Sequence, residues 1–216
     1  MTLTVPTWDL VGVIADCVPF AHPDDELPML HGVRVEWDGR MLHALATDQL
    51  RIACSSWHPD DDPGPGQQDH LLSRWGGPAD PWGVFLTLDD AKKLVSVYKL
   101  PAKQARAPLT VEVDLARLTV RRASDTGHPA IAAAFDGLDV DFPDVRRLLA
   151  KAASLERVDQ VAFSGTGLAD FGRVRQVAPL ELRFTGPTSL AHVAIGSRFT
   201  GGILPVKLGK TASGRS

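Results

Sequence analysis

One succession of secondary-structure elements repeats along this chain and limits the folds that it can adopt. Apolar residues first alternate with polar ones as in a strand, then recur with a helical period, then alternate again over three short runs. The first copy predicts elements at 2–5, 8–18, 30–37, 41–46 and 51–57. The second predicts them at 84–86, 88–98, 109–113, 118–122 and 130–135, and the third at 160–163, 168–176, 180–184, 190–195 and 202–208. The sequence therefore predicts three β-α-β-β-β units.

Local signals support these bounds. Thr7 and Thr87 each precede a predicted helix, and threonine is a favoured N-cap residue. Asp38 and Gly39 separate two strands in the way that a tight hairpin requires. Residues 58–83 are crowded with Asp, Pro and Gly, so we predict a long surface loop there.

An odd number of units has a structural consequence. If two units complete one domain, residues 1–148 form a complete domain that includes the 58–83 loop, and residues 149–208 form half of another. Residues 209–216 would be a flexible tail. A lone half-domain exposes a strand edge, which usually has to be covered or paired with another chain. We therefore expect a homo-oligomer.

Composition excludes several other classes. The 216 residues are 44% hydrophobic and 23% charged, as in an average globular protein. No apolar run approaches the roughly 18 residues that cross a bilayer, and the start lacks a signal-peptide pattern, so we expect no membrane association and a cytoplasmic location. Cys17 and Cys54 stand far apart and predict buried, reduced thiols. The net charge of -3 argues against a wholly basic surface but permits a local basic face.

Four segments resemble a known family, in the order in which the family carries them. Residues 45–53, LATDQLRIA, resemble the ATDGHRLA segment of the bacterial DNA polymerase III β sliding clamp. Residues 30–33 resemble its L-x-G-v turn, residues 142–148 its FPDYRRV segment, and residues 202–208 its terminal VVMPMRL. Up to Leu148 the chain is similar to the second clamp domain, and from Gln160 it is similar to the back half of the third.

This resemblance implies an α+β DNA-clamp fold, in which helices lie on one face of curved antiparallel sheets. It also implies a hydrophobic pocket that receives short peptide motifs of replication proteins, such as the polymerase and the clamp loader. Carried over by position, the pocket residues are Leu30, Thr47, Leu50, Arg51, Ile52, Pro143, Leu148, Ile203, Leu204, Pro205 and Val206. Gln49 and Leu50 replace the Gly-His pair of the family, so peptide preference is expected to differ. For each single residue, core packing is an equally good interpretation.

The family also encircles double-stranded DNA without sequence specificity. The basic residues that would contact phosphates here are Lys92, Lys93, Lys99, Lys103, Arg106, Arg173 and Arg175, the last two on the third helix. A merely solvated face explains such a cluster equally well. The first predicted helix weakens the DNA interpretation, because it carries no Lys or Arg between Trp8 and Phe20.

A competing motif favours an enzyme. Residues 21–26, AHPDDE, match zinc-dependent N-acetylglucosamine deacetylases, in which His and Asp bind zinc. That chemistry needs a preceding parallel strand and a distal histidine ligand, but here a helix is predicted before the motif and no HxxH pair exists. We therefore predict no catalytic residues, metal or cofactor, and keep the deacetylase as an alternative.

The sequence thus favours a non-enzymatic binding platform, or processivity factor, in DNA replication or repair. Because the family's ring contains twelve half-units, three per chain would close a ring of four chains, whereas a dimer that pairs its half-domains is equally open. A truncated clamp that competes for clamp-binding peptides without encircling DNA is a further alternative.

Overall fold

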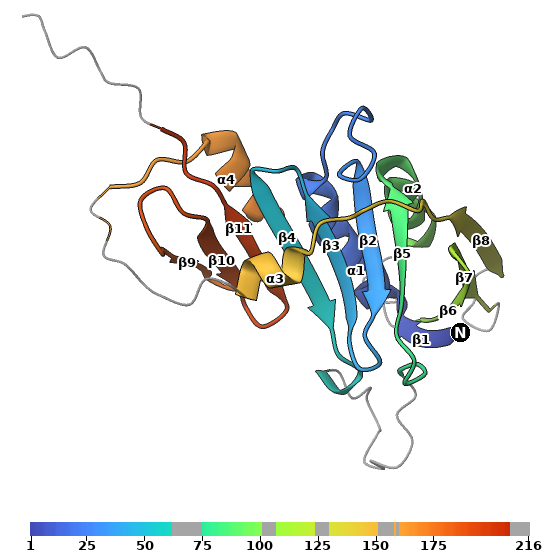
Figure 1. Cartoon of the computed structure of the whole chain (residues 1–216). Coiled ribbons are helices and arrows are strands. Elements are labelled where there is room, and N and C mark those ends of the chain that lie inside the picture. Colours follow the sequence, from blue (N-terminus) through green and yellow to red (C-terminus); the bar gives the residue numbers. More distant parts are fainter. Residues whose placement is uncertain (62–74, 101–106, 124–129, 151–157, 159, 208–216) are drawn as a thin grey trace, which may run out of the picture.

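The computed structural model describes residues 1–61, 75–100, 107–123, 130–150, 158 and 160–207. Unit 1 comprises β1 (Thr2–Pro6), α1 (Thr7–Cys17), the 3-10 helix η1 (Val18–Phe20), β2 (Gly32–Trp37), β3 (Leu42–Thr47) and β4 (Arg51–Trp57), and a second 3-10 helix, η2, follows at Pro59–Asp61. Unit 2 comprises β5 (Trp82–Thr87), α2 (Leu88–Tyr98), β6 (Pro108–Asp114), β7 (Arg117–Arg122) and β8 (Ile131–Asp136). The connecting helix α3 (Val145–Ala150) leads to unit 3, with α4 (Gly165–Phe171), β9 (Leu180–Arg183), β10 (Ala191–Ile195) and β11 (Phe199–Ile203), as Figure 1 shows.

Units 1 and 2 exchange their first strands. A four-stranded sheet has the order β1-β6-β7-β8, and a seven-stranded sheet has the order β5-β2-β3-β4-β11-β10-β9. All strand pairs in both sheets are antiparallel. Thus β1 pairs with the first meander strand of unit 2, with Thr4 opposite Thr110, and β5 pairs with that of unit 1, with Phe85 opposite Arg34. Neither unit is complete without the other.

Unit 3 joins the larger sheet through its last strand. β11 lies antiparallel to β4, with Thr200 opposite Cys54 and Gly202 opposite Ile52. A side chain at Gly201 would place its Cβ 2.6 Å from the Ile52 carbonyl oxygen and 2.9 Å from the Phe171 ring. The small residues of β11 therefore allow this close strand approach.

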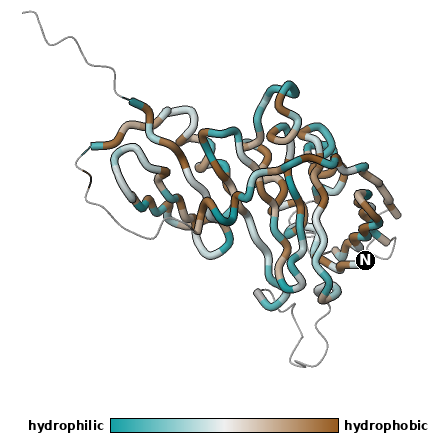
Figure 2. Tube along the Cα trace, in the orientation of Figure 1, coloured by the Kyte–Doolittle hydropathy of each residue, from teal (hydrophilic) through white to brown (hydrophobic). Residues whose placement is uncertain are grey.

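The main core lies between the sheets and the two long helices. α1 and α2 lie behind the larger sheet in Figure 1, and their buried faces join the inner strand residues in one cluster. Figure 2 shows hydrophobic and hydrophilic residues mixed along the strands, and in β6 and β7 burial alternates from residue to residue, as in a sheet with one buried face. Phe20, Phe171 and Phe199 meet in this core, with ring centroids 4.8 to 6.1 Å apart, and connect η1 to α4 and β11.

The short helix α3 covers the opposite face of the sheet (Figure 1). Its Val145 is 2% exposed and packs with Leu45, Ile52 and Cys54 in a second, smaller cluster. Arg146 adds an ion pair of 2.9 Å with Glu36. Periodicity did not predict this helix, because six residues span fewer than two turns.

The α+β fold with helices on one sheet face is confirmed for α1 and α2, and so are the two buried free cysteines. Several local predictions were wrong. Thr7 does not cap α1, because its hydroxyl donates to the Ala107 carbonyl oxygen at 2.6 Å. The last strand is 199–203 rather than 202–208, and the third helix is 165–171 rather than 168–176.

Residues 160–163 form no strand, although alternation predicted one. Of the predicted 58–83 loop, residues 82 and 83 belong to β5 and residues 62–74 lie outside the described part of the chain. The predicted tail, 209–216, also lies outside it. No helix in the described ranges is long and apolar enough to cross a membrane.

The aromatic cluster gives a stability prediction. Phe171→Ala should lower the free energy of unfolding by about 3 to 5 kcal/mol, because it removes a ring that is 1% exposed and leaves a cavity. Chemical denaturation measures the loss. Val177→Ala, at a fully exposed valine, is the control and should change stability by less than about 0.5 kcal/mol. Equal effects of the two substitutions would contradict the packing described here.

Candidate functional site

The turn between β3 and β4 is built by Asp48. Its Oδ1 accepts hydrogen bonds from the backbone N–H groups of Leu50, at 3.0 Å, and Arg51, at 2.7 Å. The Thr47 hydroxyl donates to the Arg51 carbonyl oxygen at 2.8 Å. Such side-chain bonds to the backbone are the usual means of fixing an Asp-containing turn. They leave Leu50 at the tip with 62% of its surface exposed.

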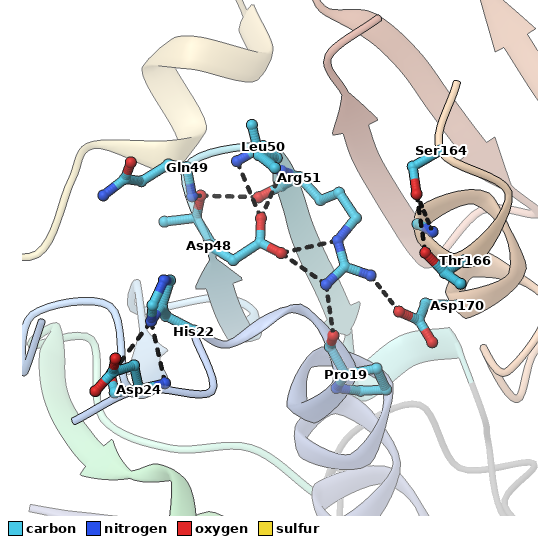
Figure 3. A network of polar contacts seen from close by, with 12 residues as sticks. Pro19, His22, Asp24, Asp48, Gln49, Leu50, Arg51, Ser164, Thr166 and Asp170 are labelled. Carbon is cyan, nitrogen blue, oxygen red and sulfur yellow. Dashed lines mark hydrogen bonds and ion pairs between the residues drawn. The ribbon is translucent and has the colours of Figure 1, made fainter. Parts of the chain in front are cut away.

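Arg51, the first residue of β4, connects this turn to two other elements. Figure 3 shows its guanidinium between the carboxylates of Asp48 and Asp170, beside the Pro19 carbonyl oxygen. Nε and Nη2 donate to Asp48 Oδ2 at 2.9 and 2.6 Å, and Nη1 donates to Asp170 on α4. Nη2 also donates to Pro19 at 3.2 Å, and the group lies 5.3 Å from the Phe20 ring centroid. One side chain thus holds β4, η1 and α4 together.

Two carboxylates, Asp48 and Asp170, offset the cost of burying the Arg51 charge. The Arg51 and Asp170 side chains are 14% and 17% exposed. Burial acts to lower the pKa of Arg51, but the hydrogen bonds and negative charges of Asp48 and Asp170 outweigh it and raise the pKa. Arg51 therefore stays charged, as a buried ion pair with several hydrogen bonds requires.

Helix α4 begins beside this cluster. Ser164 caps it by accepting from the Gly167 N–H at 3.3 Å, and its hydroxyl lies 2.8 Å from that of Thr166. Gly167 faces Arg51 and Ile203, because a Cβ there would lie 3.4 Å from a carbon of each. The glycine lets the helix sit closely against the end of β11.

A groove of about 230 Å³ opens between the turn, α4 and the chain after β11. The Leu204 N–H donates to the Leu50 carbonyl oxygen at 2.8 Å, which keeps the two apolar walls side by side. The residues that line the groove are Asp48, Leu50, Arg51, Ser164, Thr166, Gly167, Asp170, Ile203, Leu204, Pro205 and Val206. The groove therefore combines an exposed apolar surface with hydroxyl and charged groups at its rim.

Six of the predicted pocket residues border this groove: Leu50, Arg51, Ile203, Leu204, Pro205 and Val206. The structure does not bring the other five to it. Leu30, Thr47 and Ile52 are each 5 to 6% exposed. Pro143 lines a separate hollow of about 340 Å³ beside Arg34 and Glu36, and Leu148 is 44% exposed on α3.

Sequence reasoning missed the polar rim of the groove. Asp48 lies inside the recognised segment 45–53, so its place beside Arg51 was a detectable signal. Ser164, Thr166 and Asp170 belong to no recognised motif. Asp170 lies 119 residues from its partner Arg51, a separation that no local pattern reveals.

The predicted basic residues come from two parts of the chain, around α2 and after α4, and Lys99 and Arg175 line one pocket together with Trp8 and Tyr98. Lys92 lies 3.9 Å from Asp89, and Arg173 pairs with Asp170 at 2.8 Å. Arg173 and Arg175 follow α4 instead of lying on it, because the helix ends at Phe171. Lys93 and Lys99 lie on and directly after α2, whereas Lys103 and Arg106 lie outside the described residues.

Two arginines of unit 3, Arg175 and Arg198, contact side chains of helix α1. The Arg175 guanidinium lies 4.5 Å from the Trp8 ring centroid and 3.9 Å from Asp16, and Arg198 donates to Asp9 at 2.8 Å. Burial raises the pKa of Asp16, although its hydrogen bonds and the nearby arginine oppose that shift. The acids and arginines pair, so this face of α1 carries little net charge.

The AHPDDE segment forms a turn between η1 and β2. His22 Nδ1 accepts from the Asp24 N–H at 3.1 Å, and Asp24 Oδ1 accepts from the Glu26 N–H at 3.0 Å. A helix precedes the segment, and every paired strand in the described ranges is antiparallel. Within those ranges, no three His, Cys, Asp or Glu side chains are placed to hold a metal. The geometry thus lacks the framework that the deacetylase interpretation needs.

The fold is that of the sliding clamps of bacterial DNA polymerase III. The computed structure is similar to the DNA polymerase III β subunit of Thermotoga maritima, with a TM-score of 0.71 and 15% identity over 97% of this chain and 66% of that one. It is also similar to the Bacillus subtilis sliding clamp, with a TM-score of 0.69 and 15% identity, covering 96% of this chain and 64% of that one. The Pseudomonas aeruginosa β subunit has a TM-score of 0.70 and 13% identity, covering 96% of this chain and 67% of that one.

The expected clamp fold is confirmed, and the chain spans about two thirds of the length of these clamps. No protein-family model and no curated protein matches the sequence.

The turn also predicts a stabilising substitution. Gln49 has a φ of +77°, a left-handed conformation that costs a residue with a side chain about 1 to 2 kcal/mol. Gln49→Gly should therefore raise the free energy of unfolding by about 0.5 to 1 kcal/mol after the entropy cost of glycine. Leu115→Gly, at a φ of +53°, should have the same sign. A loss of stability in thermal unfolding of Gln49→Gly would contradict the turn geometry.

Proposed function

We propose that this chain is a non-catalytic binding platform of DNA replication or repair, which docks short peptide motifs in the groove between units 1 and 3. The observation that carries this proposal is the groove itself, whose apolar walls come from two units and whose geometry is held by Arg51. A surface of this shape suits an extended peptide better than a folded domain, because only a few side chains fit into it.

The chemistry of the walls supports an apolar peptide anchor. Leu50 is 62% exposed and Val206 is 45% exposed, so both leave apolar surface in water. When a bound peptide covers such apolar surface, the burial contributes about 25 cal/mol per Å² to the free energy of binding. Ser164 and Thr166 at the rim offer hydroxyls that can fix the direction of a bound backbone.

The structural neighbours support the same role. They are described as DNA polymerase III β subunits and as sliding clamps. We therefore propose that the polymerase and the clamp loader supply the peptides and that the chain acts as a processivity factor. Catalysis forms no part of this proposal.

Peptide docking predicts a defined loss on mutation. A fluorescently labelled clamp-binding peptide from a bacterial DNA polymerase should bind the wild-type chain, with its anisotropy rising on titration. Leu204→Asp and Leu50→Asp should each weaken binding at least about tenfold, because a carboxylate in the apolar wall loses hydration when the peptide covers it.

The matched control is Leu115→Asp, which changes another exposed leucine in the β6–β7 turn, outside the groove. It should leave the affinity unchanged. Equal affinity of wild type, Leu204→Asp and Leu50→Asp would overturn peptide docking at this groove.

DNA holding is a second proposal, supported by the fold and by Lys92, Lys93 and Lys99 at α2. Contacts with phosphates are sequence-independent and weaken with salt. Binding to a DNA duplex should therefore fall with salt, and Lys92→Ala with Lys93→Ala should reduce the slope of log K against log salt by up to about 1.8.

Arg117→Ala with Arg121→Ala, on β7 of the smaller sheet, is the matched control and should leave that slope unchanged. If the lysine pair also leaves it unchanged, the lysines do not contact DNA. A complete absence of DNA binding would favour the alternative of a clamp-like chain that only competes for clamp-binding peptides.

A further inference from the structure

The three units share one backbone hydrogen bond, which fixes how they correspond. In each unit, the chain beyond the last meander strand returns to the segment before the helix. Gly76 donates to the Thr4 carbonyl oxygen at 2.9 Å, Leu138 donates to that of Phe85 at 2.9 Å, and Val206 donates to that of Ala162 at 2.8 Å. Each acceptor lies three residues before its helix begins, so residues 160–163 are the equivalent of β1 and β5.

The opposite edge of this segment differs between the units. Thr4 faces Thr110 of β6, and Phe85 faces Arg34 of β2. In both cases the partner is the first meander strand of the other unit. Within the described residues, Ala162 has no such partner, and the equivalent meander strand in unit 3, β9, has no strand on its outer edge.

The burial of the side chains also differs between this segment and its equivalents. The equivalents of Val161 are Leu3 and Val84, and those of Phe163 are Val5 and Leu86; these four are at most 2% exposed. Val161 and Phe163 themselves are only half-buried. On β9, Leu180 is 39% exposed. In the part of unit 3 that the structure describes, a backbone edge is therefore unpaired and apolar side chains are only partly covered.

We propose that a second copy of this chain covers this edge, and that two half-domains form one complete domain across a two-fold axis. Residues 160–163 of each copy pair antiparallel with β9 of the other. Each unit 3 has an open edge on residues 160–163 and another on β9, and the same two edges of a second copy complement them, as an isologous interface requires. Units 1 and 2 show within one chain that this exchange closes and buries its core.

The pairing identifies the backbone groups involved. In a strand, the N–H and C=O of one residue point to the same edge, and neighbouring residues alternate. Because the Ala162 carbonyl oxygen faces Val206, the N–H groups of Val161 and Phe163 point to the open edge. The proposal thus predicts hydrogen bonds from these two residues to the second copy.

Sedimentation over a series of concentrations tests the pairing. The wild-type chain should reach twice the mass of one chain. Leu180→Glu should weaken this dimer at least about tenfold, because the pairing buries the new carboxylate. Leu138→Glu is the matched control, at a leucine that is 42% exposed in unit 2, and should leave the dimer intact.

A second variant keeps the test sharp. Val161→Pro removes one N–H from the open edge and should also weaken the dimer. In hydrogen exchange, the amides of 161 and 163 should exchange more slowly as the dimer forms. A monomer at every concentration, or a dimer that Leu180→Glu and Val161→Pro leave unchanged, would overturn the proposal. Peptide binding at the groove is a separate measurement, and its failure would leave this result standing.

Discussion

The charge cluster around Arg51 is the interaction on which the functional geometry depends. β4 and β11 bring units 1 and 3 into one sheet, but backbone pairing alone does not set the position of α4. Arg51 does so by binding Asp170 on α4 while it also holds Asp48 in the preceding turn. A buried ion pair is favourable only when its remaining hydrogen bonds are made, and the Pro19 carbonyl oxygen supplies a third acceptor for Arg51. The two apolar walls of the groove meet beside this cluster.

The parts of the fold that local rules determine could be predicted from the sequence. β4 was predicted at 51–57 and α2 at 88–98, and both have these bounds. Thr87 caps α2 by accepting from the Asp90 N–H at 3.1 Å, as threonine in that position usually does. Strand alternation and capping are properties of a few neighbouring residues, so one sequence reveals them.

Features that depend on distant partners could not be predicted in the same way. Residues 160–163 have the pattern of a strand, but a strand also needs a neighbour to pair with. Thr7 donates to Ala107, one hundred residues away, instead of capping its helix. In the groove, the apolar residues of 203–206 came from the family resemblance. Periodicity predicted a helix around Asp170, but no motif marked Asp170 or the helix cap Ser164 as site residues.

The repeat connects these observations with assembly. Units 1 and 2 each supply a strand to the other's sheet, whereas within the described residues unit 3 pairs with another unit only through β4 and β11. The proposed pairing of two third units would give a dimer of six units, half of the twelve that the family resemblance implies for a ring. In that arrangement the groove beside Arg51 remains within each chain, so peptide docking and assembly use different surfaces of unit 3.

The central claim is that Arg51 and Asp170 act as a coupled pair that fixes unit 3 against unit 1. A double-mutant cycle of Arg51→Met and Asp170→Asn, measured by chemical denaturation, tests this claim directly. Our account predicts a coupling of about 1 to 3 kcal/mol, because the two side chains are in direct contact and largely buried. Additive effects of the two substitutions, with no coupling between them, would contradict it.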